Sequence, residues 1–179
     1  LLNPSLDIRD WIICSMIMLW AIRLGSFLFW RVKTVGQDKR FTVMKTKFTW
    51  FLLTWTLGGL WVLVTMAAGL AALTSNTTIE LNILGYIGIA LWLFGFAVEV
   101  IADNQKSQFK KDPNNQGRFI TSGLWSWSQH PNYFGEIILW FGLALLAFPV
   151  LSGWQLVTLV SPVFVYFLLT KVSGIPILD

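Results

Sequence analysis

The sequence predicts an all-α, multipass transmembrane helical bundle with about five spans in this chain. Of the 179 residues, 55% are hydrophobic and only 12% are charged, whereas a soluble domain typically has about 25% charged residues. An aromatic content of 16%, with 11 tryptophans, excludes a disordered chain. Five apolar runs can cross about 30 Å of hydrocarbon as helices, and they occupy residues 11–29, 51–73, 83–101, 133–151 and 154–170.

The first three runs are predicted to be packed transmembrane helices. Run 11–29 is too long for a cleaved signal, and no small-residue cleavage site precedes the basic Arg31, so it is a true span. The second and third runs contain small residues that predict close helix contacts. These are Gly58, Gly59, Ala68, Gly69, Ala72, Gly85 and Gly88.

The last two runs are joined by a short turn at 149–153, which predicts antiparallel neighbours. Pro131 suits the first position of the fourth helix, with His130 near its N-cap. Residues 1–179 contain no repeat and are predicted to form a single integral membrane domain. Because the chain starts at Leu1 and ends without a polar tail, we expect a fragment of a longer chain that lacks N-terminal helices and a C-terminal tail.

The distribution of basic residues predicts the orientation. Segments 31–47 and 103–132 carry most of the Lys and Arg residues, whereas the loop at 74–82 and the turn at 149–153 have none. The positive-inside rule therefore places the basic loops in the cytosol. The formal net charge of +4 resides in these loops, so no nucleic-acid partner is expected. One cysteine and one histidine cannot form a zinc site, so no metal is expected.

Three ionisable residues lie within the apolar runs: Arg23, Glu99 and Glu136. A central charge costs roughly 2.5–3.5 kcal/mol on insertion scales, so such residues either reach interfacial water or form a functional site. Helical spacing aligns Glu99 with Asp103, and Asn132 with Glu136. These positions predict a pocket that opens to the cytosol, polar at its mouth and aromatic at greater depth.

The polar segment from 103 to 131 is suited to binding anions. Its cations lie among amide side chains, a mixture that fits phosphates and nucleotide bases, although positive-inside bias or anionic lipid binding explains it equally well. The cations are Lys106, Lys110, Lys111 and Arg118. The start of the fourth helix can hold a phosphate or a carboxamide, and Gly135 permits close approach to its backbone. His130 is either a cap or a proton donor, and Trp125 and Trp127 suit interface anchors.

Three segments together resemble a known family. They are Glu99-Val-Ile-Ala-Asp103-Asn-Gln-Lys106, Arg118-Phe-Ile-Thr-Ser-Gly123-Leu-Trp125 and His130-Pro-Asn132-Tyr133-Phe-Gly135-Glu136. In order and separation they resemble the C-terminal catalytic region of the steroid 5-alpha-reductase superfamily, particularly its bacterial multipass branch. Integral sterol reductases have a similar His-x-Asn-Tyr-x-Gly-acid segment. The resemblance extends from the first span to the end of the chain and implies location in a bacterial inner membrane.

The resemblance implies a membrane-embedded, NADPH-dependent oxidoreductase of lipid metabolism. Its substrate would be a hydrophobic small molecule, an enone lipid or steroid-like compound, whose C=C bond is reduced. The implied cofactor-binding residues are Asp103, Lys110 and Arg118 for adenosine and phosphate, Asn132 and Glu136 near the nicotinamide, and Glu99, where the steroid branch has asparagine. The catalytic residue is unidentified, and the candidates are Arg23, Tyr133 and His130.

Two alternatives differ in chemical class. Isoprenylcysteine carboxyl methyltransferases have a similar Arg-His-Pro-x-Tyr-x-Gly segment and use S-adenosylmethionine, but Gln129 stands where their arginine would be. Asn132 and Glu136 also favour the reductase. The second alternative is a non-catalytic, lipid-binding membrane bundle, which would bind neither NADPH nor S-adenosylmethionine.

Overall fold

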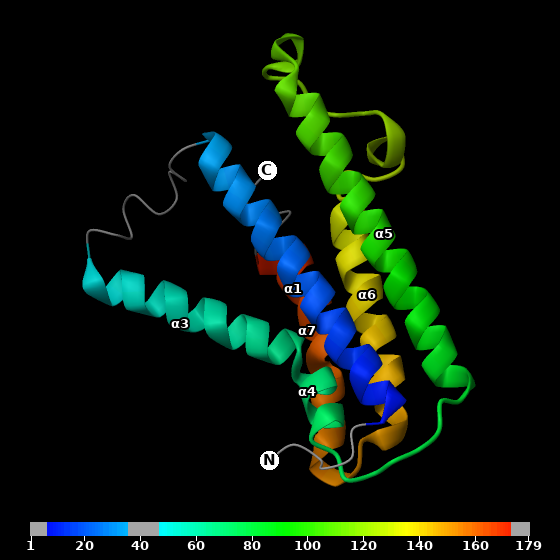
Figure 1. The fold of residues 1–179 in the computed structure, drawn as a ribbon. Helices are drawn as coiled ribbons and strands as arrows, with labels where there is room; N and C mark the ends of the chain where they lie inside the picture. The colour runs from blue at the N-terminus through cyan, green and yellow to red at the C-terminus, as the bar shows by residue number, and fades with distance from the viewer. Residues whose placement is uncertain (1–6, 36–46, 173–179) are drawn as a thin grey trace.

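A computed structural model describes residues 7–35 and 47–172 of the chain (Figure 1). Within these ranges five helical segments are long and apolar enough to cross a membrane: Ile8–Lys33, Phe48–Thr65, Ile83–Lys111, Pro131–Val150 and Gly153–Lys171. The described residues contain helices and no strand. The predicted all-α membrane bundle is therefore confirmed. The middle of the predicted basic loop 31–47, residues 36–46, lies outside the described residues.

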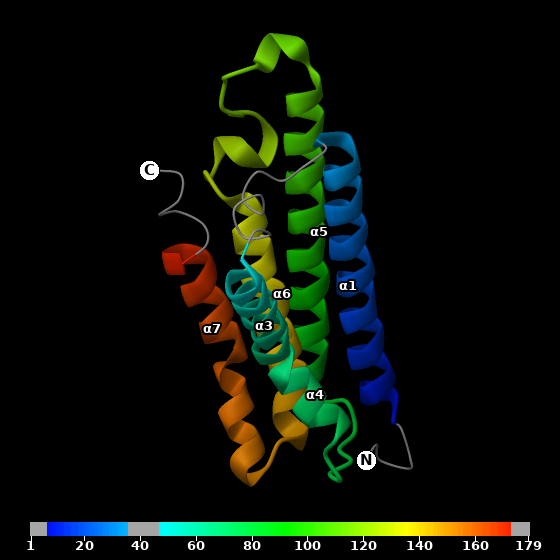
Figure 2. The same ribbon diagram turned by 90° about the vertical axis from the view of Figure 1, so that its left-hand side faces the viewer.

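The α-helices are α1 Ile8–Val35, α3 Phe48–Thr65, α4 Ala67–Leu73, α5 Ile83–Lys111, α6 Pro131–Ala147 and α7 Ser161–Phe167. Shorter 3-10 segments are η1 Pro113–Asn115, η2 Gly123–Ser126, η3 Phe148–Val150 and η4 Gly153–Val160, and η5 Leu168–Val172 is a π-helix. Figures 1 and 2 show α5 and α6 side by side, with α7 as the antiparallel neighbour of α6. The end at which α1 and α5 finish and α6 begins is called the basic end below.

The second predicted helix is not continuous, because it breaks at Met66 between α3 and α4. Helix α4 is buried, whereas α3 points away from the bundle in Figure 1 and is mostly exposed. The prediction that Gly58 and Gly59 pack against another helix is wrong, since a Cβ at either position would meet no atom within 4 Å. Gly69 of α4 makes such a contact, with Ile17 and Leu143.

Helix α5 continues well past the end of its apolar run. It begins where the Asn82 side chain accepts a hydrogen bond from the Gly85 amide at 3.1 Å, an N-cap, and it ends at Lys111. The lysines of its last turn interact favourably with the helix dipole. The polar residues after Ile101 therefore extend the helix, where the sequence predicted a loop.

Helices α5 and α6 touch through their backbones. A Cβ at Gly95 would lie 2.6 Å from the Gly135 carbonyl oxygen, and one at Gly88 would lie 2.6 Å from the Gly142 carbonyl oxygen. These distances are too short for any side chain larger than hydrogen. The buried residues of α5 form one stripe with helical spacing, namely Gly85, Gly88, Trp92, Gly95, Glu99 and Ala102. Glu99 therefore belongs to the face that packs on α6.

The backbone contact predicts a strong effect of a single methyl group. Gly95→Ala should destabilise the bundle by about 1–3 kcal/mol because the helices must separate. Gly59→Ala is the matched control, with open space around its Cβ and a gain in helix propensity of up to ~1 kcal/mol. Thermal unfolding in detergent measures both variants. An unchanged melting temperature for Gly95→Ala would contradict the contact.

Candidate functional site

A cluster of ion pairs joins α1 to α5 toward the basic end. Arg23 Nη1 donates to Glu99 Oε1, and Arg23 Nη2 donates to Asp103 Oδ2. The two carboxylates are four residues apart on α5, so they lie on one helix face and meet the two arms of a single guanidinium. Glu99 is only 5% exposed. Two predicted site residues and one catalytic candidate thus come together here.

Asn132 extends this cluster to α6. Its Nδ2 donates to Asp103 Oδ1 at 3.4 Å, a long hydrogen bond. Both Asp103 oxygens therefore have partners within the protein. In the described part of the chain, Asn132 Oδ1 and Glu99 Oε2 are buried without an N–H or O–H donor, and the Glu99 carboxyl lies beside that of Glu136. Unpaired buried acceptors are costly, and Asn132 Oδ1 suits an N–H donor from a ligand.

Glu136 is held by two tryptophans. Trp20 Nε1 of α1 and Trp140 Nε1 of α6 donate to the same oxygen, Glu136 Oε1, at 3.0 and 2.8 Å. The two indole rings also meet edge to face, with centroids 4.9 Å apart. Neither tryptophan is among the site residues predicted from the sequence. Their spacing was the available signal, because Trp20 precedes Arg23 by three residues and Trp140 follows Glu136 by four.

Gly135 brings the two acidic helices together. A Cβ there would lie 2.8 Å from the Glu99 backbone nitrogen, so α5 itself occupies the space beside this glycine. The close approach to this backbone that Gly135 predicts is made by the neighbouring helix α5. Glu99 and Glu136 consequently project from backbones in direct contact.

The start of α6 agrees with the prediction from Pro131. Helix α6 begins at this residue, and His130 occupies the N-cap position without a capping side-chain hydrogen bond. The His130 ring stacks on Tyr133, with centroids 4.9 Å apart and an interplanar angle of 8°. Two of the three catalytic candidates therefore form one stacked pair on the first turn of α6.

The loop before α6 is attached to α5. Trp125 is buried, and its Nε1 donates to the Ala102 carbonyl at 3.0 Å, while the Leu124 amide donates to Gln105 Oε1 at 3.0 Å. Gly123 has a φ of +62° and no room for a Cβ against Gln105. Lys106 Nζ lies over the Trp125 ring, 4.6 Å from its centroid. The Gly-Leu-Trp motif thus fixes the loop on α5.

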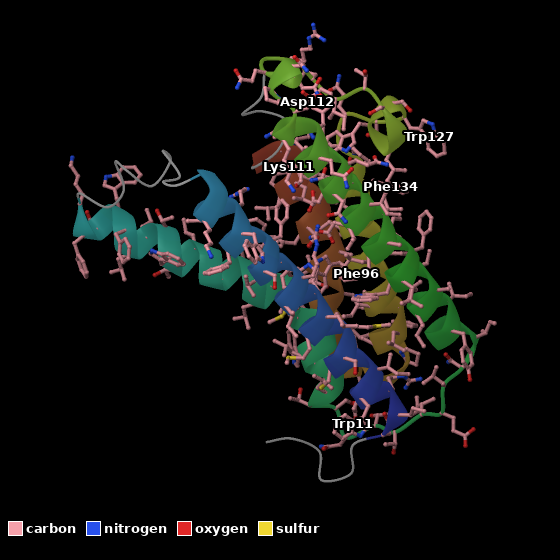
Figure 3. All side chains as sticks on the ribbon, turned by 45° about the horizontal axis from the view of Figure 1, so that its top comes forward. Trp11, Phe96, Lys111, Asp112, Trp127 and Phe134 are labelled. Atoms are coloured by element: carbon pink, nitrogen blue, oxygen red, sulfur yellow. The ribbon has the colours of Figure 1, made fainter. Side chains whose placement is uncertain are left out.

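The predicted phosphate-binding residues are separate from the acidic cluster. Lys110 lies two turns beyond Asp103 on α5, about 10 Å along the axis, and both Lys110 and Arg118 are exposed. Figure 3 shows Lys111 and Asp112 at this end of the molecule and Trp127 and Phe134 along its side. On α5, the exposed Lys110 therefore lies beyond the Glu99 and Asp103 carboxylates, toward the end of the helix.

An apolar groove of about 300 Å³ lies between α1 and α5, away from the basic end. It is lined by Ile8, Trp11, Ile12, Ser15, Met16, Leu19, Ile89, Trp92 and Leu93. None of the cluster residues is in this lining. The Arg23 ion pairs with Glu99 and Asp103 lie outside this groove.

Comparison with known proteins identifies relatives of two chemical classes. A stretch of 127 residues is 31% identical to "Probable O-methyltransferase ustE" of Ustilaginoidea virens and covers 60% of this chain and 45% of that protein. A stretch of 67 residues is 31% identical to 3-oxo-5-alpha-steroid 4-dehydrogenase 1 of Bos taurus and covers 37% of this chain and 26% of that protein. The Homo sapiens 3-oxo-5-alpha-steroid 4-dehydrogenase 1 is 33% identical over 64 residues, covering 36% and 25%.

The chain spans less than half the length of these curated relatives. No solved structure matches it. The family described as "Protein of unknown function (DUF1295)" matches residues 1–179 in full. The chain is therefore an integral membrane protein that belongs to the DUF1295 family, within the steroid 5-alpha-reductase-like superfamily.

Proposed function

We propose that this chain carries the cofactor site of a membrane-embedded, NADPH-dependent oxidoreductase that reduces the C=C bond of an enone lipid or steroid-like substrate. The observation that supports this most is the convergence of Glu99, Asp103, Asn132 and Glu136 at the α5–α6 contact. In this proposal the chain is a single membrane domain whose basic end faces the cytosol, and the substrate enters from the bilayer.

The residues present fit NADPH. Asn132 Oδ1 is a buried acceptor without a partner in the described part of the chain, and it suits an amide N–H group of a nicotinamide. Lys110 and Arg118 are exposed nearby and suit phosphate oxygens. When bound, NADPH supplies the hydride for the β-carbon of the enone.

The chain's own residues would then stabilise the developing negative charge and supply a proton. Hydride addition at the β-carbon places negative charge on the enone oxygen, which requires a hydrogen-bond donor. Arg23 is suited to this, because its described hydrogen bonds use two of the five N–H donors of a guanidinium. The α-carbon must also gain a proton, for which the stacked His130 and Tyr133 are the candidate sources.

A second candidate function is methyl transfer from S-adenosylmethionine. The similarity to the fungal O-methyltransferase covers 60% of this chain, more than the similarity to the steroid dehydrogenases. The cluster also contains three carboxyl groups, Glu99, Asp103 and Glu136, against the single guanidinium of Arg23. Such an excess of acidic groups favours a cationic ligand, and a sulfonium is cationic.

Ligand-induced thermal shifts discriminate between the two cofactors. A ligand at 100 times its Kd stabilises the folded state by about 2.7 kcal/mol, so NADPH should raise the melting temperature of the detergent-solubilised chain by several degrees. S-adenosylmethionine should not. A shift with S-adenosylmethionine alone would favour the methyltransferase, and a shift with neither would favour a non-catalytic bundle.

The site assignment predicts weaker NADPH binding after truncation of α6 side chains. Asn132→Ala and Glu136→Ala should each raise the Kd about tenfold, because each removes a hydrogen-bonding group from a buried site. Asn76→Ala and Glu80→Ala are matched controls at exposed positions of the opposite end. Titration calorimetry measures all four variants. Equal affinities for wild type, Asn132→Ala and Glu136→Ala would rule out this site.

A further inference from the structure

The carboxylate of Glu136 has an asymmetric environment. Both indole hydrogen bonds that it accepts end on Oε1, one from Trp20 and one from Trp140, and the carboxyl group also lies beside that of Glu99. The donors come from different helices, and their side chains are almost wholly buried, at 6% and 1% exposure. We call the Trp20–Glu136–Trp140 arrangement the indole clamp.

The indole clamp restricts the orientation of the Glu136 carboxyl group. An indole N–H can only donate, so two indoles require Oε1 to act purely as an acceptor. Hydrogen bonds to an ionised group in a water-poor interior are stronger than neutral ones. The edge-to-face contact between the rings fixes the direction of both N–H groups. Rotation of the carboxylate would break two such bonds at once.

We propose that Trp20 and Trp140 are positioning residues that engage Glu136 Oε1 and thereby fix the orientation in which the Glu136 carboxyl, beside Glu99, meets the cofactor. This inference rests on the proposed function, because the ligand that meets this carboxyl is the proposed cofactor. Trp20 is one turn from Arg23 on α1, so the same face of α1 supports Glu136 and pairs with Glu99 and Asp103. The position of α1 against α5 and α6 therefore completes the site.

Trp92 provides a matched control. It is as buried as Trp140, at 1% exposure, and lies in the same hydrophobic core, but its indole N–H has no hydrogen-bond partner in the described residues. Replacement of each tryptophan by phenylalanine keeps an aromatic ring and removes the N–H. Trp20→Phe and Trp140→Phe should each weaken NADPH binding about tenfold. Trp92→Phe should leave the affinity within about twofold of wild type.

A double-mutant cycle separates positioning from general structural support. In a Glu136→Ala background, Trp20→Phe and Trp140→Phe should cause no further loss of NADPH affinity, because they act only through Glu136. An equal loss in both backgrounds would overturn the positioning role. So would unchanged affinity in the single variants, or an equal loss in Trp92→Phe.

A ligand-free measurement tests the indole clamp independently of the cofactor. In ¹⁵N–¹H spectra of the detergent-solubilised chain, the indole signals of Trp20, Trp140 and Trp92 are identified by their loss in the phenylalanine variants. Glu136→Ala should move the first two and leave the third. Unmoved signals would overturn the indole clamp. If the wild-type chain binds S-adenosylmethionine instead of NADPH, the reductase proposal fails, and the same double-mutant cycle with S-adenosylmethionine then tests the positioning role. If the wild-type chain binds neither ligand, the positioning role is overturned.

Discussion

The pairing of charge inside a bilayer governs how this chain is assembled. A central charge costs roughly 2.5–3.5 kcal/mol on insertion scales, so Arg23, Glu99 and Glu136 require partners. Arg23 takes two carboxylates of α5, and this fixes the rotation and depth of α1 against that helix. Trp20 is then directed at Glu136 from the same face of α1. One ion-pair network thus determines which side chains of α1 enter the site.

The close contact of α5 and α6 positions the carboxylates that accept hydrogen bonds in this network. Glycines at Gly88, Gly95, Gly135 and Gly142 let the two backbones touch, and Glu99 lies in the same buried stripe as the first two. A polar group in such a contact has no access to lipid headgroups or bulk water, so it must be satisfied by protein or ligand. The tight helix contact and the polar site are therefore parts of one arrangement.

Much of the fold follows from local sequence properties, whereas the ion-pair and hydrogen-bond partners between helices do not. Run length predicted five spans, and four-residue spacing placed Glu99 and Asp103 on one face. The partners of Arg23 are 76 and 80 residues away, and apolar periodicity carries no information on such contacts. Only its three-residue spacing from Arg23 distinguishes Trp20 from tryptophans that face lipid. The break at Met66 was also missed, because neither glycine nor proline marks it and only the change from exposed α3 to buried α4 accompanies it.

The stability of charge-neutralised variants tests the central role of the Arg23 network most directly. Removal of one partner of a buried ion pair typically costs about 3–5 kcal/mol, whereas replacement of all partners is often close to neutral. Arg23→Met alone should therefore destabilise the chain strongly in detergent unfolding experiments. Addition of Glu99→Gln and Asp103→Asn to Arg23→Met should restore most of the loss. Additive destabilisation in the triple variant would contradict the account.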